Sequence, residues 1–427
     1  MTRQFWVLVH RYAGLYMAFF LTVAGMTGSV LAFYQELDGW LNPERHYVVP
    51  QDKPLLDGYT LREKALALEP HAQVNMISFN LKPGQVYEIF LSPRNDPETG
   101  KPYDLGHNLI RLNPYSGELI EYGKDEGLWP LSRRNILSVI YSLHYSLALG
   151  EVGGWLFGIA ALIWTVDCFV GFYLTLPIRR NNSEVRLKQP LAQQQKGYWS
   201  RWVVAWKIKW PASNYRINFD LHRAGGLWTW IMLFVFAWSS VCFNLRTQVY
   251  QPVMVALFDL PDIGNLPIAN LPQPRPEPGI DWHTAQTIGQ RFMAEQAELQ
   301  HFNIYAEDTL LYLPEKGLFA YGTKTDRDIG DKNGGTAVYF DGDSGKFVSL
   351  FMPSGQNAGI TATLWLVTLH MAGIWGLPFQ IFVCLMGLVV AMLSITGVYI
   401  WLKKRRARLF SQKRQMSIPH ESKGLTP

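Results

Sequence analysis

The sequence predicts a mainly α-helical membrane protein, a four-span helical bundle built from two tandem repeats. Four apolar runs each come near the ~20 residues that a spanning helix needs. Several short motifs occur twice in the same order along the chain, which indicates a duplication. Mean hydropathy over the whole chain is near zero, so folded domains in water are expected beside the spans. Each repeat should therefore contain a span, a small α+β domain and a second span.

Hydrophobic residues make up 48% of the 427-residue chain. They concentrate in four runs: Tyr12–Phe33, Gly154–Leu176, Gly226–Leu245 and Phe379–Leu402. The first run is too long for a removable signal peptide and lacks a small-residue cleavage site, so an uncleaved anchor is expected. The three cysteines lie inside apolar runs without metal or disulfide spacing, which predicts packing residues. No Cys-x-x-Cys-His occurs, which excludes covalent c-type haem.

The formal charge of +5 does not indicate nucleic-acid binding, because the basic residues gather beside the apolar runs. They are Arg3, Arg11, Arg179, Arg180, Lys403, Lys404, Arg405 and Arg406. Cytoplasmic loops carry an excess of such residues. Both termini and the loop 178–222 are therefore expected in the cytoplasm, with the two long regions between spans on the opposite side.

The two long regions match each other. NLIRLNPYSGELI (108–120) parallels AVYFDGDSGKFV (337–348), and both predict a hairpin with a Ser-Gly turn. A helical stretch (60–68 and 283–296) and then a strand-like run, VYEIFLSP or GLFAYGT, precede each hairpin. Because each repeat holds two spans, both copies insert the same way up, and the pseudo-two-fold axis should lie along the membrane normal.

These patterns predict the following order along the chain. It is a first span (1–34), an outer domain (35–135), a short outer helix and second span (136–178), a cytoplasmic loop (179–221), a third span (222–246), a second outer domain (247–360), a short outer helix and fourth span (361–403), and a cytoplasmic tail (404–427). Two segments break the symmetry. The proline-rich 261–278 predicts an extended linker. YWSRWVVAWKIKW (198–210) predicts a helix in the headgroup layer, with a docking surface for a cytoplasmic partner as the alternative.

Four histidines form two matched pairs. His10 and His222 open HRYAGL and HRAGGL, whereas His144 and His370 each follow a leucine and precede a Gly-x-Tyr by the same distance. Histidines within spans are costly and usually functional. The topology places the first two near the cytoplasmic face and the other two near the outer face. Pairing within a repeat would have to bridge the membrane, so His10 is expected to pair with His222, and His144 with His370.

The outer histidines are expected on short separate helices. One helix from His144 to Gly171 would cover ~40 Å at 1.5 Å per residue, whereas the hydrocarbon core is only ~30 Å thick. Gly150 and Gly376 stand at matched positions after the histidines. We expect the chain to break there.

Two axial histidines with no open position suit haem used for electron transfer. Without cysteine attachment, the pairs predict two b-type haems, with Arg11 and Arg223 placed to pair with propionates. Several alternatives stay open: interfacial anchors, a structural role, or a divalent-metal site in a transporter. Asp167 is a lone acid in the second span, either a proton relay or a satisfied structural group. The span tryptophans are expected to be packing residues, or one lies between the haems.

The histidine motifs, the segments SLHYSLALG and TLHMAGIWG, and the terminal GFYLTLPIRR and GVYIWLKKRR resemble the PepSY-associated transmembrane helix family. The outer regions resemble PepSY modules through their NPYSGEL and DGDSGKF turns. The resemblance extends over nearly the whole chain and points to the ferrisiderophore reductase (FoxB/PiuB-like) branch. It implies a bacterial inner-membrane protein of iron uptake that reduces ferric siderophore in the periplasm, with haem ligands at His10, His144, His222 and His370. The second repeat departs from the family pattern after its first histidine, reading WIMLFVFAWSSVCF.

No Rossmann glycine fingerprint occurs, so electrons are expected from a separate cytoplasmic reductase or from membrane quinol. Two other functions stay open. One is a non-haem membrane sensor or assembly protein that binds partners through its outer modules. The other keeps the haems but reduces a copper chelate or a periplasmic thiol system.

Overall fold

The computed structural model describes residues 2–124, 127–178, 197–258 and 269–416. Arg179, Arg180 and the first part of the proline-rich segment 261–278 lie outside these ranges. The chain divides into two compact units. The helical unit comprises residues 1–32, 140–246 and 381–427, and the outer unit comprises 33–139 and 247–380.

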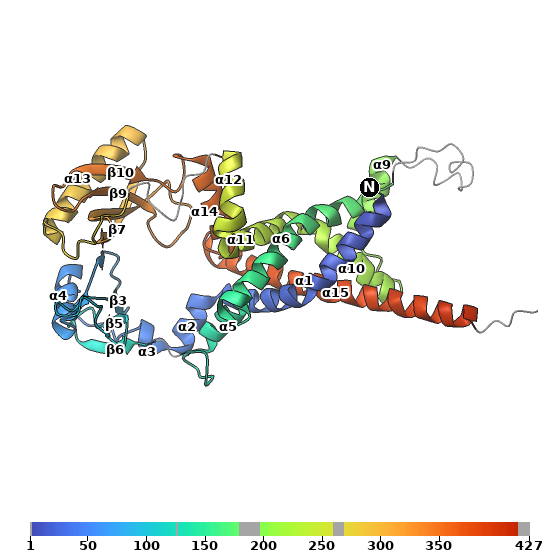
Figure 1. Cartoon of the computed structure of the whole chain (residues 1–427), viewed down its shortest axis with the longest axis horizontal. Helices are drawn as coiled ribbons and strands as arrows, with labels where there is room; N and C mark the ends of the chain where they lie inside the picture. The colour runs from blue at the N-terminus through green and yellow to red at the C-terminus, as the bar shows by residue number, and fades with distance from the viewer. Residues whose placement is uncertain (1, 125–126, 179–196, 259–268, 417–427) are drawn as a thin grey trace, which may run out of the picture. The chain divides into compact units, whose positions relative to one another are not determined.

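Long apolar helices build the helical unit. They are α1 (Arg3–Leu31), α6 (Gly150–Thr175), α10 (Asn214–Trp228), α11 (Trp230–Asn244) and α15 (Gly376–Met416). Three of these helices are long and apolar enough to cross a membrane, and α10 with α11 makes a fourth span if the bent pair counts as one. In Figure 1, α6 packs beside α1 and α11. The chain is thus a membrane protein with several candidate spans.

The third expected span, 222–246, is not one straight helix. α10 and α11 meet at Thr229 and bend by 73°. Trp230, the first residue of α11, donates its indole N–H to the Cys168 carbonyl at 2.8 Å. Its ring also packs against Phe169 and Phe172 of α6. These contacts with α6 hold the start of α11 away from the direction of α10.

The chain breaks near both outer histidines. α5 (Ile136–Ser146) ends before α6 begins at Gly150, which has φ 58°. A Cβ on Gly153 would lie 1.6 Å from the Ser146 carbonyl oxygen, so only glycine lets α6 pass this close to the end of α5. α14 (Ala358–His370) likewise ends before α15 begins at Gly376, with φ 57°.

Small residues bring α1 and α15 into close contact. A Cβ on Gly25 would lie 2.5 Å from the Gly387 carbonyl oxygen. Ser29 donates its hydroxyl to the Cys384 carbonyl at 2.9 Å. Such pairs of small residues with a hydrogen bond are a common way for helices to associate in membranes.

The tryptophan-rich segment 198–210 is helical over only part of its expected length. It forms α9 (Tyr198–Trp202) and the 3₁₀ turn η1 (Val203–Trp206). Trp202 packs on Phe172 and donates to the Thr175 hydroxyl at 3.2 Å, whereas Trp199 stays 69% exposed. The segment is therefore partly docked on the end of α6, because Trp202 faces the protein.

The first outer module consists of a helix on a small sheet. After α2 (Tyr34–Leu41) and α3 (Pro43–His46) come α4 (Gly58–Leu68), β1 (Ala72–Gln73), β2 (Met76–Ser78), β3 (Tyr87–Phe90), β4 (Ser92–Pro93), β5 (Leu109–Leu112) and β6 (Leu119–Gly123). The antiparallel sheet has the order β3-β5-β6, and β1 pairs with β4. Leu61 and Ala65 of α4 pack on Ile110 and Leu112 of β5 in the core of the module. The expected helix and hairpin are both present.

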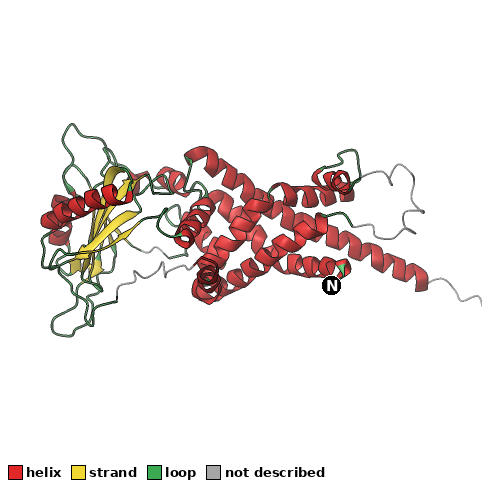
Figure 2. Cartoon of the chain, turned by 90° about the horizontal axis from the view of Figure 1, so that it is seen from above, coloured by secondary structure: helices red, strands yellow, loops and turns green. Residues whose placement is uncertain are grey.

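The second outer module also has a helix followed by antiparallel strands. α12 (Gln251–Phe258) comes after the short π-turn η2 (Arg246–Tyr250), and the module then forms α13 (Trp282–Gln300), β7 (Ile304–Leu313), β8 (Leu318–Thr325), β9 (Thr336–Asp341) and β10 (Phe347–Phe351). Its core packs Phe292 and Met293 of α13 against Phe319 and Phe340 of the sheet. In Figure 2 the helices (red) lie over the strands (yellow) of the outer unit.

The two outer modules share a sheet, which the sequence does not predict. β2 of the first module pairs with β7 of the second, so the five-stranded sheet has the order β10-β9-β8-β7-β2. The register places Ile77 opposite Leu310, and both side chains are fully buried. Arg62 also lies 4.4 Å over the Trp282 ring. The outer regions therefore form one body.

Candidate cofactor site

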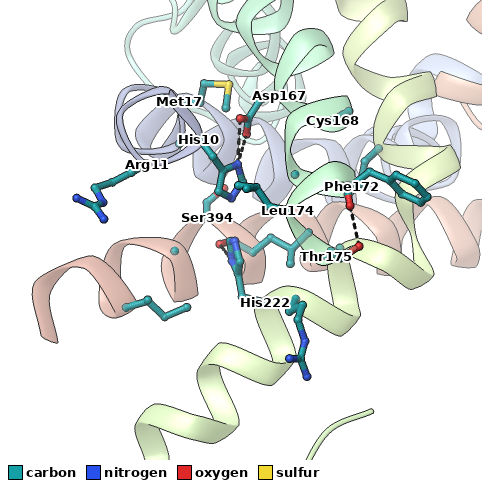
Figure 3. Close-up of a pocket in the computed structure, with 18 of the residues that line it drawn as sticks. His10, Arg11, Met17, Asp167, Cys168, Phe172, Leu174, Thr175, His222 and Ser394 are labelled. Atoms are coloured by element: carbon teal, nitrogen blue, oxygen red, sulfur yellow. Dashed lines mark hydrogen bonds and ion pairs between the residues drawn. The ribbon is translucent and has the colours of Figure 1, made fainter. Parts of the chain in front are cut away.

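A cavity of about 460 Å³ lies inside the helical unit. Side chains from α1, α6, α10, α11 and α15 line it, most of them apolar. Figure 3 shows His10 and His222 entering it from different helices. Ligand sites usually have volumes of roughly 300–1,000 Å³ and an apolar wall with a few polar groups. The cavity meets this description.

The structure brings His10 and His222 together. Their ring centres are 6.0 Å apart, and the ring planes are inclined by 59°. A ring nitrogen lies about 2 Å from a metal that it binds, so two histidines on opposite sides of one metal have ring centres roughly 6 Å apart. The observed separation therefore fits one metal ion held between the two imidazoles.

Both imidazoles use their Nδ1 atoms for contacts away from each other. His10 Nδ1 lies 2.9 and 3.0 Å from the two carboxylate oxygens of Asp167. His222 Nδ1 lies 2.9 Å from the Leu393 carbonyl and 3.2 Å from the Thr396 hydroxyl. With Nδ1 protonated and donating, each Nε2 is left as the ligand atom. Metal-binding histidines are almost always oriented by such a second hydrogen bond.

Glycines shape the wall around the histidines. Gly14 and Gly226 each stand four residues after a histidine, line the cavity, and have nothing within 4 Å of a Cβ placed on them. Gly171 and Gly397 pack against the rings, where a Cβ would lie 3.5 Å from His10 Cε1 and 3.2 Å from His222 Cε1. Together they leave open space on the ligand side. The repeated Gly-x-Tyr motif thus corresponds to ring contacts of the inner pair.

The two arginines expected near propionates have different surroundings. Arg223 donates to Asp220 at 2.7 Å and to the Val204 carbonyl at 2.9 Å. Because Asp220 is fully buried, Arg223 has a structural role whether or not a ligand is present. Arg11 also lines the cavity, but its side chain extends away from His10 in Figure 3. Arg3 and Lys404 add two further basic residues to the wall.

The outer histidines belong to different units. His144 lies in the helical unit, with its Nδ1 3.1 Å from both the Ala24 carbonyl and the Thr27 hydroxyl. A Cβ on Gly28 would lie 2.9 Å from His144 Cε1, so this ring packs closely on α1. His370 is the last residue of α14, in the outer unit. Their expected pairing stays a prediction.

Asp167 is the functional candidate that sequence reasoning left undecided. The sequence presents it as an isolated acid in an apolar run, and the structure makes it the partner of His10. The available signal was its place four residues before Gly171, about one helical turn, in the same apolar run. Within the described ranges, no group of three or more His, Cys, Asp or Glu side chains could hold a metal ion.

Comparison with known proteins identifies the family. No curated protein matches the chain significantly. A family model described as PepSY-associated TM region matches residues 7–404, which cover nearly the whole chain and all four histidines. The chain therefore belongs to the PepSY-associated TM region family.

Proposed function

We propose that this protein is an inner-membrane di-haem b oxidoreductase that reduces ferric siderophore, a ferric-chelate reductase of the FoxB/PiuB-like branch. One observation carries the proposal. His10 and His222 face each other across an apolar cavity at the spacing of two axial ligands, with both Nδ1 atoms already engaged. Haem with two histidine ligands suits electron transfer, since no position is left for oxygen chemistry.

The chain would hold the inner haem in a defined way. The Nε2 atoms of His10 and His222 would hold the iron, and Gly14 and Gly226 leave room for a flat ring. The apolar wall would limit the access of water to a bound cofactor. The bound haem supplies a reversible one-electron change. Basic residues of the wall, Arg11 among them, attract the carboxylates of the cofactor.

We further propose that the chain is a tandem duplication with a second haem near the outer face, held by His144 and His370. Matched contacts support the duplication. Asp167 and Leu393 accept from His10 and His222, and both stand four residues before a glycine that touches the same ring. In both outer modules a helix is followed by antiparallel strands that end in a hairpin, β5–β6 and β9–β10. A pseudo-two-fold axis along the membrane normal relates such copies.

The substrate and the direction of transfer rest on the family and on charge. Basic residues beside the spans support cytoplasmic termini, and the outer modules would then lie in the periplasm. A haem held by His10 and His222 would receive electrons from a separate reductase or quinol, and a haem held by His144 and His370 would pass them to a ferric chelate. Iron is then released as Fe²⁺ for uptake.

Visible spectra test the proposal. Protein purified from haem-replete cells should show a b-type spectrum that changes with dithionite and is reoxidised by ferric siderophore. His10→Ala and His222→Ala should each remove about half of the haem, whereas His283→Ala, an exposed residue of the outer unit, should remove none. Absence of a reducible haem would leave the sensor or assembly function. Haem that ferric chelates do not reoxidise would leave a copper chelate or a thiol system as the acceptor.

A further inference from the structure

We propose that Asp167 is a positioning residue that makes His10 a stronger electron-donating ligand than His222, and so lowers the reduction potential of the inner haem. This inference rests on the proposed function. It concerns a difference between two ligands that the duplicated sequence makes look alike.

The two inner histidines have unlike partners at matched positions. His10 Nδ1 faces both oxygens of the Asp167 carboxylate, at 2.9 and 3.0 Å. His222 Nδ1 faces a neutral carbonyl, that of Leu393 at 2.9 Å, and the Thr396 hydroxyl. One ligand therefore donates to an anion and the other to neutral groups.

Burial makes the carboxylate effective. The Asp167 side chain is only 9% exposed, and Asp167 lines the cavity together with apolar residues such as Met17 and Trp164. Its two oxygens face the same nitrogen, so its negative charge is directed at His10. A hydrogen bond from a ligating histidine to a carboxylate raises the basicity of the ligand. A more basic ligand stabilises ferric iron over ferrous iron, which lowers the potential.

The simpler alternative is a purely structural contact. His10 lies on α1 and Asp167 on α6, so their bond also ties two neighbouring helices together. A structural role predicts that losing the carboxylate lowers stability and leaves the potential unchanged. A positioning role predicts a shift in potential even in a variant that folds normally.

Three variants separate these readings. Asp167→Asn keeps the shape and an acceptor oxygen but removes the charge, Asp167→Glu restores the charge, and Thr396→Val removes a neutral contact from the other ligand. The variants are made in full-length protein that also carries His144→Ala, so that only the inner haem is bound. Potentiometric titration, followed by the absorbance of the reduced haem, then measures the midpoint potential of the inner haem. Each tenfold loss of preference for ferric iron corresponds to about +59 mV for one electron.

We expect Asp167→Asn to raise the midpoint potential by at least one such tenfold step. Asp167→Glu should keep the midpoint potential close to the wild-type value. Thr396→Val should change the midpoint potential by less than half as much as Asp167→Asn does. Equal shifts in Asp167→Asn and Thr396→Val, or none in Asp167→Asn, would overturn the inference while leaving the di-haem function intact. Wild-type protein without haem would instead overturn the proposed function itself. If Asp167→Asn does not fold, two other variants decide the inference. A midpoint potential that is unchanged in Asp167→Glu and lowered in Leu393→Asp supports the inference. An unchanged midpoint potential in Leu393→Asp refutes it.

Discussion

Substituting Gly25 by alanine should loosen the contact between α1 and α15. The added Cβ would lie 2.5 Å from the Gly387 carbonyl oxygen and 3.0 Å from the Ala391 nitrogen. Both are backbone atoms, so no side chain can rotate out of the way. The helices must separate by about 0.9 Å at this point to restore an ordinary contact of 3.4 Å.

The separation has two costs. Overpacking of a tight contact usually costs about 1–3 kcal/mol. The Ser29 to Cys384 hydrogen bond, now 2.9 Å, would lengthen beyond bonding distance, and such bonds in membranes average about 0.6 kcal/mol. Alanine itself favours a helix over glycine by about 0.5–1 kcal/mol. The free energy of unfolding should therefore fall by about 1–3 kcal/mol.

Equilibrium unfolding in mixed micelles, followed by circular dichroism, measures the change. Gly154→Ala is the matched control, because its Cβ would have no neighbour nearer than the Asn244 side-chain oxygen at 3.7 Å. The control should unfold like the wild type or be slightly more stable. If Gly25→Ala is as stable as Gly154→Ala, the close approach of α1 and α15 is refuted.

Two further predictions concern the outer unit. Ile77→Ala leaves a cavity where β2 meets β7 and should lower the free energy of unfolding by about 2–5 kcal/mol, which is measured as faster hydrogen exchange in both strands. The control Ile120→Ala, at a 36% exposed position, should change little. Equal protection from exchange in both variants would contradict the pairing. Asp281→Ala removes the N-cap of α13, whose carboxylate accepts from the Thr284 N–H at 3.0 Å, and should cost about 1 kcal/mol. The Thr284 hydroxyl bond holds the pKa of Asp281 below its ordinary 3.8, so this stabilisation is present above pH 3.8 and is lost as pH falls through the lower folded value. Denaturant titrations measure the difference in the free energy of unfolding between wild type and Asp281→Ala. If that difference stayed constant at lower pH, the result would argue against the cap.

Local patterns account for the elements that the sequence predicts. The Ser-Gly turns with alternating apolar residues produce β5–β6 and β9–β10, and the apolar runs produce the long helices. The bend at Thr229 has a weaker local signal, the pair Gly225 and Gly226 one turn earlier. The contact of Trp230 with α6 is tertiary, and the local sequence does not predict it.

The candidate site is likewise predicted only in part by the sequence. The duplicated motifs identify His10 and His222, and their glycines explain why the rings fit. The sequence cannot say what holds each ring, since the Leu393 carbonyl belongs to the backbone and leaves no mark on residue identity. Asp167 can be noticed as an acid, but its role depends on how α1 lies on α6.

The shared sheet of the outer unit has a consequence for how the chain is made. The partner of β2 at Met76 is Leu311, which the ribosome adds more than 230 residues later. Until then β2 has an exposed edge that can pair with other chains. The first outer module therefore cannot complete its sheet until the second has been made, and a chaperone would have a defined segment to protect. Truncation after the second span would leave that edge permanently open.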